Sequence, residues 1–390
     1  MMENHTYDNY LGMLGRGPGE QPRGDGFTLG PDGRPTAANA YPDGRVQHAF
    51  RMPTTCQLEK VPSQEWQQAH IQFNGGRNDG FVKSASGPVA MGYWTGDDLP
   101  WAYSLATTFP VADRWFAPVM GQTQPNRRYL LAATSVGMVD DILPENALPP
   151  LKGTIFDRLD ANKIPWRNYH SSSPPTSYLF LEDAAEDHVS VVPIAQFFAD
   201  AKTGNLPGFA IIDPDFGHSS EENPQNIVHG EVFAASVVQA VMDSPAWPHT
   251  LLVWTFDEGG GYYDHVPPPP AVAPDDIPPL QLPWYDKFAR YGFRVPAVVV
   301  SPWARANHVT SVVHDHTSIL AMVERKWNLP AMTHRDAAAA DLSDFLDLTQ
   351  PTFAKPPSLA APLAGPAQLA CENKNNGPGQ IPPPGSVTTG

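Results

Sequence analysis

Two adjacent carboxylates near the middle of the chain are its clearest candidates for chemistry. Asp257 and Glu258 follow Thr250–Thr255, an apolar, β-prone run that predicts a buried parallel strand. The glycines after them let the backbone turn sharply. Ligands of open α/β sheets bind beyond the carboxyl ends of the strands. Oxygen atoms there favour a hard or borderline cation, so we interpret the two acids as metal ligands rather than as a helix cap or surface acids.

Two further pairs of residues could contribute ligands. Glu3 and Asn4 place a carboxylate beside a carboxamide, although Asn4 could equally cap a helix. Asp264 and His265 follow the two central acids within one loop. Carboxylates with a carboxamide suit Ca²⁺, Mg²⁺ or Mn²⁺ better than an ion that prefers thiolates, and Zn²⁺ stays open. The sequence therefore leaves the identity of the metal undetermined.

Thr123 is the candidate for a reactive or anion-binding hydroxyl. It precedes a predicted helix over Asn126–Thr134, so its hydroxyl could lie among backbone N–H groups that favour phosphate. Arg127, one turn later, could donate two hydrogen bonds to a phosphate. The alternative is that Thr123 or Asn126 merely caps the helix.

The histidines are candidates for proton transfer or phosphate contact. His316 lies in the run Val313–Ser318, where it could contact a phosphate or a metal. That run could equally be a loop in which Asp315 caps the next helix. Taken singly, each of the other histidines is more often structural or solvated than catalytic. These others are His70, His170, His218 and His229.

Composition narrows the class of partner. The net charge of −16 argues against nucleic acid, because phosphate contacts need clustered Lys and Arg, and against docking on anionic lipid. No run of eighteen apolar residues occurs, so no transmembrane helix is predicted. Residues 1–20 are polar and glycine-rich and show no signal-peptide pattern, which leaves the compartment open. Cys56 and Cys371 could form one disulfide or remain two unrelated thiols.

Strand and helix patterns alternate along the chain. This alternation indicates an α/β fold, with a parallel or mixed sheet flanked by helices. The polar segment 14–55 is expected to be functional or flexible, and residues 349–390, rich in Pro, Ala and Gly, to form a poorly structured tail. The predicted strands are Val189–Pro193, Gly208–Ile212, Thr250–Thr255 and Pro296–Ser301, and the main predicted helices are 64–74, Leu99–Phe109, Gly230–Ser244 and Thr317–Trp327.

Several motifs occur in an order that is highly specific. Together they resemble the bacterial phosphoesterase family of phospholipases C and acid phosphatases, within the alkaline-phosphatase-like superfamily. The resemblance implies an alkaline-phosphatase-like three-layer sandwich, with a mostly parallel central sheet flanked by helices, as a domain over residues 1–348. The motifs are Glu3–Gly12, Asn74–Phe81, Met91–Pro100, Gly121–Arg127, Asp257–Pro269 and Arg294–Ser318.

The resemblance also implies roles for individual residues. Thr123 is expected to be the nucleophile that forms a phospho-threonine intermediate, with one divalent metal touching its oxygen. His316 and His265 would hydrogen-bond the phosphoryl group or protonate the leaving alkoxide. The implied metal ligands are Glu3, Asn4, Asp257 and Glu258, and the implied substrate-binding residues are Arg127, Asn126, His70 and His218.

Two departures from the family pattern bear on the substrate. Many members carry a histidine before the tryptophan of the Asn-Gly-Gly region, whereas Glu65 precedes Trp66 here and leaves His70. Many also have a His-Pro-Pro segment before the Gly-Glu helix, where this chain has His218 and His229 nearby. The histidines that would contact the phosphate or leaving group are therefore less certain than the metal ligands.

The expected activity is that of a metal-dependent phosphoric ester hydrolase of phospholipase C type, acting as a monomer on a phospholipid or a small phosphate ester. The alternatives are a broad acid phosphatase and an N-terminally truncated, inactive homologue that binds phospho-ligands. The inactive homologue is considered because the family has an apolar strand before its Glu-Asn pair, whereas in this sequence Met1 and Met2 alone precede Glu3 and Asn4. We expect a start codon assigned too late rather than a fold that tolerates losing a central strand.

Overall fold

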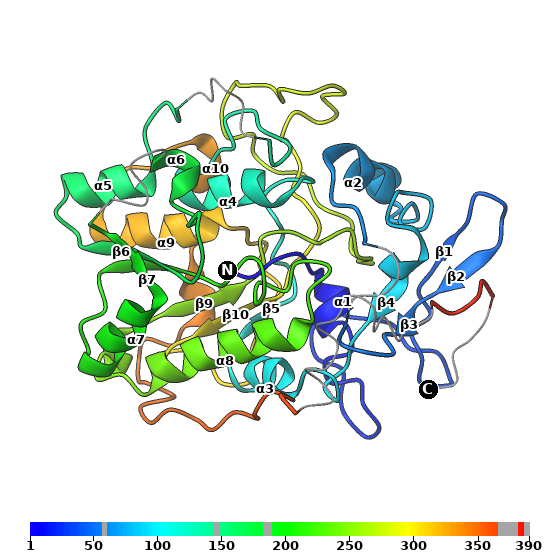
Figure 1. The fold of residues 1–390 in the computed structure, drawn as a ribbon, viewed down its shortest axis with the longest axis horizontal. Helices are drawn as coiled ribbons and strands as arrows, with labels where there is room; N and C mark the ends of the chain where they lie inside the picture. Colours follow the sequence, from blue (N-terminus) through cyan, green and yellow to red (C-terminus); the bar gives the residue numbers. More distant parts are fainter. Residues whose placement is uncertain (57–60, 143–148, 182–188, 366–380, 386–390) are drawn as a thin grey trace.

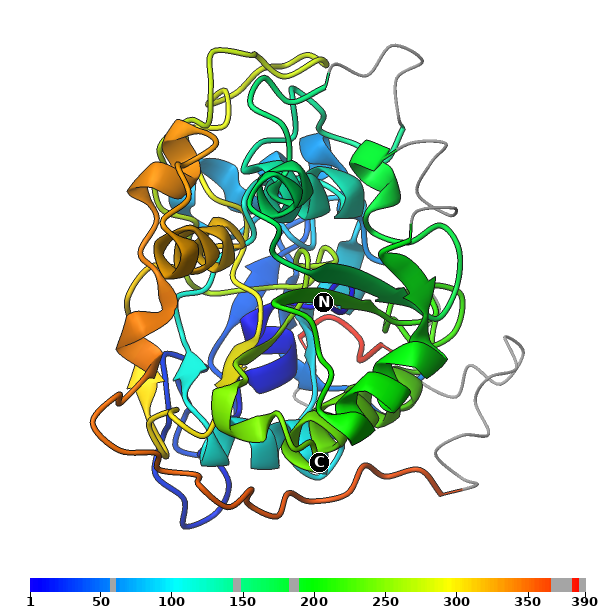
Figure 2. The ribbon, with the colours of Figure 1, turned by 90° about the vertical axis from the view of Figure 1, so that its left-hand side faces the viewer.

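The computed structural model describes residues 1–56, 61–142, 149–181, 189–365 and 381–385. Helices cover both faces of a layer of strands, which gives an α/β arrangement of three layers (Figures 1 and 2). In Figure 1, α4, α5, α9 and α10 lie above the strands, and α3, α7 and α8 lie below them. The helices are α1 (Tyr7–Leu11), α2 (Trp66–Phe73), α3 (Pro100–Thr108), α4 (Thr123–Ala132), α5 (Ile155–Ala161), α6 (Tyr178–Leu181), α7 (Ile194–Thr203), α8 (Ile227–Met242), α9 (Thr317–Trp327) and α10 (His334–Ala338).

The strands of the central layer form two separate sheets. One sheet has the order β7-β6-β8 and is parallel throughout. The other has the order β11-β5-β10-β9, in which β10 runs antiparallel to both neighbours and β11 is parallel to β5. The strands are β5 (Val111–Ala112), β6 (Trp166–His170), β7 (Val191–Pro193), β8 (Phe209–Asp213), β9 (Leu252–Thr255), β10 (Ala297–Val300) and β11 (Val309–Thr310).

The expectation of one mostly parallel central sheet is therefore wrong in part. β9, predicted as a parallel strand, pairs with β10 in antiparallel register. β8 and β9 are each the last strand of their sheet, and among the described strands none bridges them. The helices and strands predicted from apolar patterns are present, with ends shifted by a few residues, and α9 has the predicted bounds of Thr317–Trp327.

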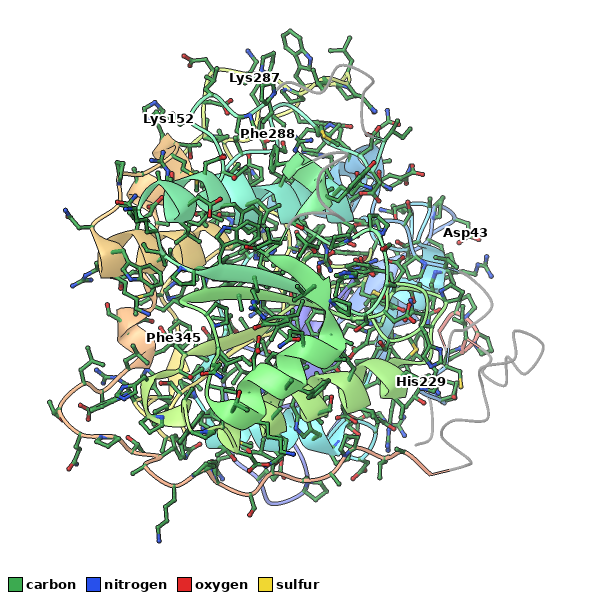
Figure 3. The ribbon with its side chains drawn as sticks, turned by 60° about the vertical axis from the view of Figure 1, so that its left-hand side comes forward. Asp43, Lys152, His229, Lys287, Phe288 and Phe345 are labelled. Carbon is green, nitrogen blue, oxygen red and sulfur yellow. The ribbon has the colours of Figure 1, made fainter. Side chains whose placement is uncertain are left out.

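Hydrophobic packing is divided in the same way as the sheets. Side chains fill most of the space between the layers (Figure 3). One core packs β9 and β10 on α3 and α8, and a second packs β6 and β8 on α4, α5 and α9. Members of the first core include Trp254, Val298, Leu105 and Val238, and members of the second include Trp166, Ile211, Leu131, Phe156 and Leu320.

The segment 14–55 and the chain end lie outside the three layers. β1 (Ala38–Ala40) and β2 (Val46–His48) form an antiparallel hairpin, and β3 (Phe50–Arg51) pairs in parallel with β4 (Gly92–Tyr93). After Thr349 the described residues form no helix or strand, but Phe353 packs on the ring of Phe109. Cys371 lies outside the described residues.

The first residues of the chain run beside the end of β9. The Met2 N–H donates to the Thr255 carbonyl at 2.8 Å, and the Asp257 N–H donates to the Met2 carbonyl at 3.0 Å. These bonds make a parallel bridge between Met2 and Phe256. The chain therefore delivers Glu3 and Asn4 to the carboxyl end of the strand that carries Asp257.

Candidate active site

Backbone and side-chain hydrogen bonds join three distant segments at one point. The Asn4 N–H donates to Asp257 Oδ1 at 3.3 Å, and the Thr123 hydroxyl donates to Asn4 Oδ1 at 3.3 Å. Asn4 has a φ of 74°, a left-handed conformation that asparagine tolerates better than most residues. The carbonyl of Asn4 lies 2.0 Å from where a Cβ on Gly260 would be, so this approach requires a glycine in the loop after Glu258.

Thr123 is the first residue of α4 and is half-buried. Asp141 holds the two residues that flank Thr123. The Gln124 N–H donates to Asp141 Oδ1 at 2.7 Å, and the Asp141 N–H donates to Gln122 Oε1 at 3.2 Å. Asn126 supports the same turn, donating at 2.9 Å to the carbonyls of Gly121 and Gln122. These bonds give Asn126 a positioning role in the turn, and the substrate contact implied by the resemblance stays a prediction.

Arg127 is the cation at the centre of these acids. Its Nε donates to Asp257 Oδ2 at 3.0 Å, and its guanidinium lies 3.5 Å from Glu3 and 3.7 Å from Asp213. The side chain is 3% exposed. Its other hydrogen bonds go to the Thr176 hydroxyl at 3.0 Å and the Met1 carbonyl at 3.5 Å, and the contact with a phosphate that the sequence suggested stays a prediction. Asp213, at the end of β8, had no sequence signal of its own.

The acids around Arg127 carry more negative charge than one guanidinium neutralises. Burial raises the pKa of Glu3 to about 8, against the opposing effect of Arg127. Burial likewise raises the pKa of Glu222 to about 9 and that of Asp141 to about 6. The pKa of Glu258 is well above its usual range because of burial and the nearby Asp257 charge. Such shifts mark carboxylates that lack a compensating cation.

The donor types around Asp257 suit a hard divalent ion, although the carboxylates of Glu3, Asp257 and Glu258, all in the described part of the chain, do not bring three ligand atoms within 4.8 Å of one another. Glu258 Oε1 is buried and has no hydrogen-bond partner within the described part of the chain. Carboxylate and carboxamide oxygens from Glu3, Asn4, Asp257 and Glu258 are the ligand types that Ca²⁺, Mg²⁺ and Mn²⁺ prefer. We call these four residues, with Arg127 and Thr123, the Asp257 cluster.

A second buried group of acids lies around Arg294. One ligand atom each from Asp8, Asp264 and His265 lies within 4.8 Å of the others, so this group could hold a metal ion. Arg294 donates to Asp264 Oδ1 at 2.9 Å and to Asp8 Oδ1 at 3.2 Å. We call these four residues the Arg294 cluster. The sequence singled out Asp264 and His265 but gave no separate signal for Asp8.

Both ring nitrogens of His265 contact carboxylates at this second cluster. Its Nδ1 lies 2.7 Å from Asp8 Oδ2, and its Nε2 lies 3.2 Å from Asp25 Oδ1. Burial alone would lower its pKa, but the hydrogen bonds to Asp25 and Asp8 raise the pKa of His265 to about 10. An imidazolium held by two carboxylates is a poor general acid at neutral pH, because proton transfer works best when the pKa is near the operating pH.

His316 is fully buried and uses both ring nitrogens. Trp115 Nε1 donates to His316 Nδ1 at 3.2 Å, and His316 Nε2 lies 2.8 Å from the Asp257 carbonyl. Because the indole can only donate, Nδ1 is the acceptor and Nε2 carries the proton. Burial lowers the pKa of His316 to about 3. A neutral His316 therefore holds the Asp257 backbone in place, which differs from the proton transfer implied by the resemblance.

His70 and His218 lie on other elements. His70 Nδ1 is 2.7 Å from the Trp66 carbonyl, and its ring stacks on Tyr285 with centroids 3.7 Å apart. Burial lowers the pKa of His70 to about 4. The His218 ring lies 4.3 Å from that of His229. Neither arrangement assigns these histidines to the reacting centre.

Comparisons with known proteins agree with these motifs. Residues 1–330 match the Phosphoesterase family. Non-specific phospholipase C1 of Arabidopsis thaliana is 30% identical over an alignment that covers 88% of this chain and 69% of that protein. Phospholipase C A of Mycobacterium tuberculosis is 28% identical over an alignment that covers 94% of this chain and 79% of that protein.

Other matches are partial. Non-specific phospholipase C6 of Arabidopsis thaliana is 34% identical over an alignment that covers 65% of this chain and 52% of that protein. A crystal structure of a protein in the alkaline phosphatase superfamily from Vibrio parahaemolyticus aligns with a TM-score of 0.42 and 12% identity, over 75% of this chain and 72% of that one. No helix in the described part of the chain is long and apolar enough to cross a membrane. The match over residues 1–330 shows that the chain belongs to the phosphoesterase family, a family of phosphoric ester hydrolases that includes phospholipases C.

Proposed function

We propose that this chain is a metal-dependent phosphoric ester hydrolase of phospholipase C type, which cleaves a phospholipid or a related phosphodiester through a covalent phospho-Thr123. The observation that carries the proposal is the contact of the Thr123 hydroxyl with Asn4, which is itself bonded to Asp257. The names of the relatives supply the class of substrate.

In the first step, Thr123 Oγ1 forms a bond to phosphorus while the bond to the leaving alkoxide breaks, and the proton released by the Thr123 hydroxyl is balanced by the one that the alkoxide takes up to leave as an alcohol. In the second step, the oxygen of a water molecule bonds to phosphorus and Thr123 leaves as its hydroxyl. Glu3, Asn4, Asp257 and Glu258 would hold one divalent ion, whose chemistry is to lower the pKa of the hydroxyl and screen phosphoryl charge. The amino end of α4 adds backbone dipoles that favour the anionic group.

The experiment compares Thr123→Ala and Thr123→Ser with the unchanged chain on a chromogenic phosphodiester. We expect Thr123→Ala to lose at least about 10³-fold in kcat/KM, whereas Thr123→Ser retains measurable turnover because it keeps a hydroxyl. Phosphate trapped on Thr123 after acid quenching would identify the intermediate by mass. Unchanged turnover in Thr123→Ala would refute the proposal.

An inactive protein that binds phosphate esters is the second candidate. It is favoured by Arg127, which already pairs with Asp257 and lies near two further carboxylates. This candidate predicts phosphate-ester binding that survives a chelator, with no release of alcohol. The hydrolase predicts turnover that a chelator abolishes and a divalent ion restores. Comparison of a phosphodiester with a phosphomonoester would then separate phospholipase C activity from that of a broad phosphatase.

A further inference from the structure

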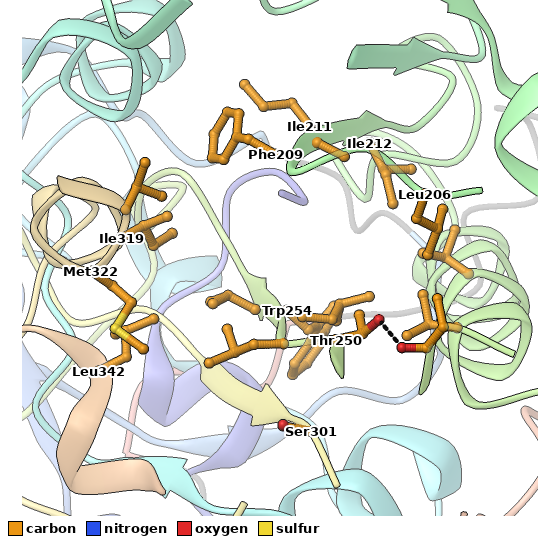
Figure 4. Close-up of a pocket in the computed structure, with 18 of the residues that line it drawn as sticks. Leu206, Phe209, Ile211, Ile212, Thr250, Trp254, Ser301, Ile319, Met322 and Leu342 are labelled. Carbon is orange, nitrogen blue, oxygen red and sulfur yellow. Dashed lines mark hydrogen bonds between the residues drawn. The ribbon is translucent and has the colours of Figure 1, made fainter. Parts of the chain in front are cut away.

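Apolar side chains are left without full cover in two places. One is a cavity of about 860 Å³ between β8 and β9, lined by Leu206, Ile212 and Met322 among others (Figure 4). The other is residues 280–285, which we call the apolar loop, in the yellow-green segment at the top of Figures 1 and 2. The cavity lies within the layer of strands, whereas the apolar loop projects into solvent and is placed to touch a large surface.

The apolar loop exposes four large side chains within six residues. Leu282 is 77% exposed and Leu280 is 56% exposed, and the exposed fractions of Trp284 and Tyr285 are 42% and 44%. Single exposed apolar residues are normal on a protein surface, but a contiguous apolar patch marks a site that binds a protein or a membrane. Four such residues on one short loop form a patch of this kind.

Backbone and ring contacts hold the apolar loop in its outward position. The Leu280 N–H donates to the Gly137 carbonyl at 2.8 Å, and Trp66 Nε1 donates to the Pro283 carbonyl at 3.0 Å. The ring of Tyr285 stacks on a histidine of α2 with centroids 3.7 Å apart. The loop is thus anchored at its start, its middle and its end, so the exposure of its side chains is a fixed feature of the fold.

One neighbouring segment joins the apolar loop to the candidate active site. Residues 137–141 bond to the loop at Leu280 and end at Asp141, whose hydrogen bonds hold both neighbours of Thr123. The side-chain amide of Gln281 donates to an acid of the same segment. Figure 1 shows the loop above α4, the helix that begins at Thr123. A surface that receives the loop would therefore lie beside the proposed reacting centre.

The charges near the apolar loop favour a zwitterionic surface over an anionic one. Asp276 and Asp286 flank the loop, and the whole chain has a net charge of −16, whereas anionic lipid attracts clustered Lys and Arg. Lys287 lies 5.4 Å from the centre of the Trp284 ring and can pair with a lipid phosphate. Aromatic faces attract quaternary ammonium groups, so both charges of a phosphatidylcholine headgroup find a partner here.

We propose that the apolar loop is the surface by which this protein binds a phosphatidylcholine bilayer. Leu280 and Leu282 enter the boundary between headgroups and acyl chains, and Trp284 and Tyr285 lie at the level of the headgroups. Docking in this way holds the amino end of α4 near the headgroups, so that a phosphodiester reaches Thr123 without leaving the bilayer completely. The inference rests on the proposed function for its class of lipid, and it adds the surface that binds that lipid.

The test measures flotation with phosphatidylcholine vesicles for the unchanged chain and for the double variant Leu282→Ser/Trp284→Ser. We expect the double variant to bind vesicles at least about tenfold more weakly, because it loses two apolar side chains that would be buried in the bilayer. Its kcat/KM for a water-soluble phosphodiester should stay within about twofold of the unchanged value, because neither side chain belongs to the Asp257 cluster.

Two further variants control for the kind and the place of the change. Trp284→Phe keeps an aromatic ring in the loop, so its vesicle binding should stay within about threefold of that of the unchanged chain. Leu348→Ser removes an equally exposed leucine, 69% exposed, that borders the cavity of Figure 4 instead of the loop. Its vesicle binding should equal that of the unchanged chain.

Thr123→Ala separates this inference from the proposed function. It should float with vesicles as the unchanged chain does while it loses turnover. Full turnover of the soluble substrate by Thr123→Ala would refute the phospho-threonine mechanism, and vesicle binding that depends on the apolar loop would still support the lipid surface.

Three outcomes would overturn the proposal. The first is that the unchanged chain does not float with the vesicles, or floats no better than the double variant. The second is loss of binding in Leu348→Ser with full binding in the double variant, which would make the cavity the lipid contact. The third is a dimer in sedimentation that the double variant abolishes, without vesicle binding by either chain, which would make a second copy the partner of the loop.

Discussion

The two buried acid clusters use similar residues in opposite ways. In the Arg294 cluster, Arg294 and a protonated His265 face Asp8 and Asp264, and the hydrogen bonds connect every charged group. In the Asp257 cluster, Arg127 pairs with Asp257 and lies 3.5 Å from Glu3, and the pKa values of Glu3, Asp257 and Glu258 are all raised. The pKa of Asp264 is raised by burial as well, to about 6, so the clusters differ less in burial than in bonding: Glu258 Oε1 has no hydrogen-bond partner in the described part of the chain.

The largest expected difference is in activity. Asp257→Asn should lower kcat/KM for a phosphodiester by at least about 10³-fold, because it removes a carboxylate of the proposed metal site, which Asn4 links to Thr123. Its free energy of unfolding should change by about 1 kcal/mol or less, since Arg127 stays close to Glu3 and Asp213. Asp264→Asn is the matched change in the Arg294 cluster and should lower stability more than activity per folded molecule. Equal losses of activity in both variants would break the comparison.

The second difference is in stability. Arg294→Met should lower the free energy of unfolding by about 3–5 kcal/mol, because it leaves Asp8 and Asp264 buried without their partner. Arg290→Met is the control, because Arg290 is partly exposed and pairs with Asp286 at 3.4 Å, so its loss should cost under about 1 kcal/mol. Urea denaturation measures both. A loss for Arg294→Met no larger than the control would show that this cluster does not stabilise the fold.

The third difference is in the pH dependence of stability. Glu3 has a folded pKa of about 8 against an ordinary value of 4.5, so the folded chain holds a proton that the unfolded chain releases. In the absence of metal, the contribution of Glu3 to the free energy of unfolding should therefore be complete below pH 4.5 and be lost as the pH rises from 4.5 to 8. Urea denaturation at several pH values in a chelator measures this. Glu3→Gln or added Mn²⁺ should flatten the fall.

The Arg294 cluster should respond in a different window. The pKa of His265 is raised from 6.5 to about 10, so its contribution is complete below pH 6.5 and is lost between pH 6.5 and 10. Added Mn²⁺ should leave this loss unchanged, whereas His265→Gln should remove it. A metal that flattens both windows would mean that both clusters bind the ion.

Local patterns predicted much of the fold. The apolar period of Thr317–Trp327 gave α9 its bounds, and Asn328 ends the helix in a left-handed conformation. β6 was not predicted, because the polar and apolar side chains of Trp166–His170 do not alternate as they do in a typical half-buried strand. Asn168 is nevertheless buried in the sheet, donating to Asp213 at 2.7 Å. A polar residue of this kind can be placed only once its partner is known.

The sequence by itself determined the family, the candidate nucleophile and the acids at the end of β9, because motif order and the apolar run before Asp257 are local properties. Only the tertiary structure decided which charges are neutralised, how His265 and His316 use their nitrogens, and that β8 and β9 face each other across a cavity. Burial, pKa and strand pairing depend on residues such as Asp8 and Arg294, which are far apart in the chain and meet only on folding.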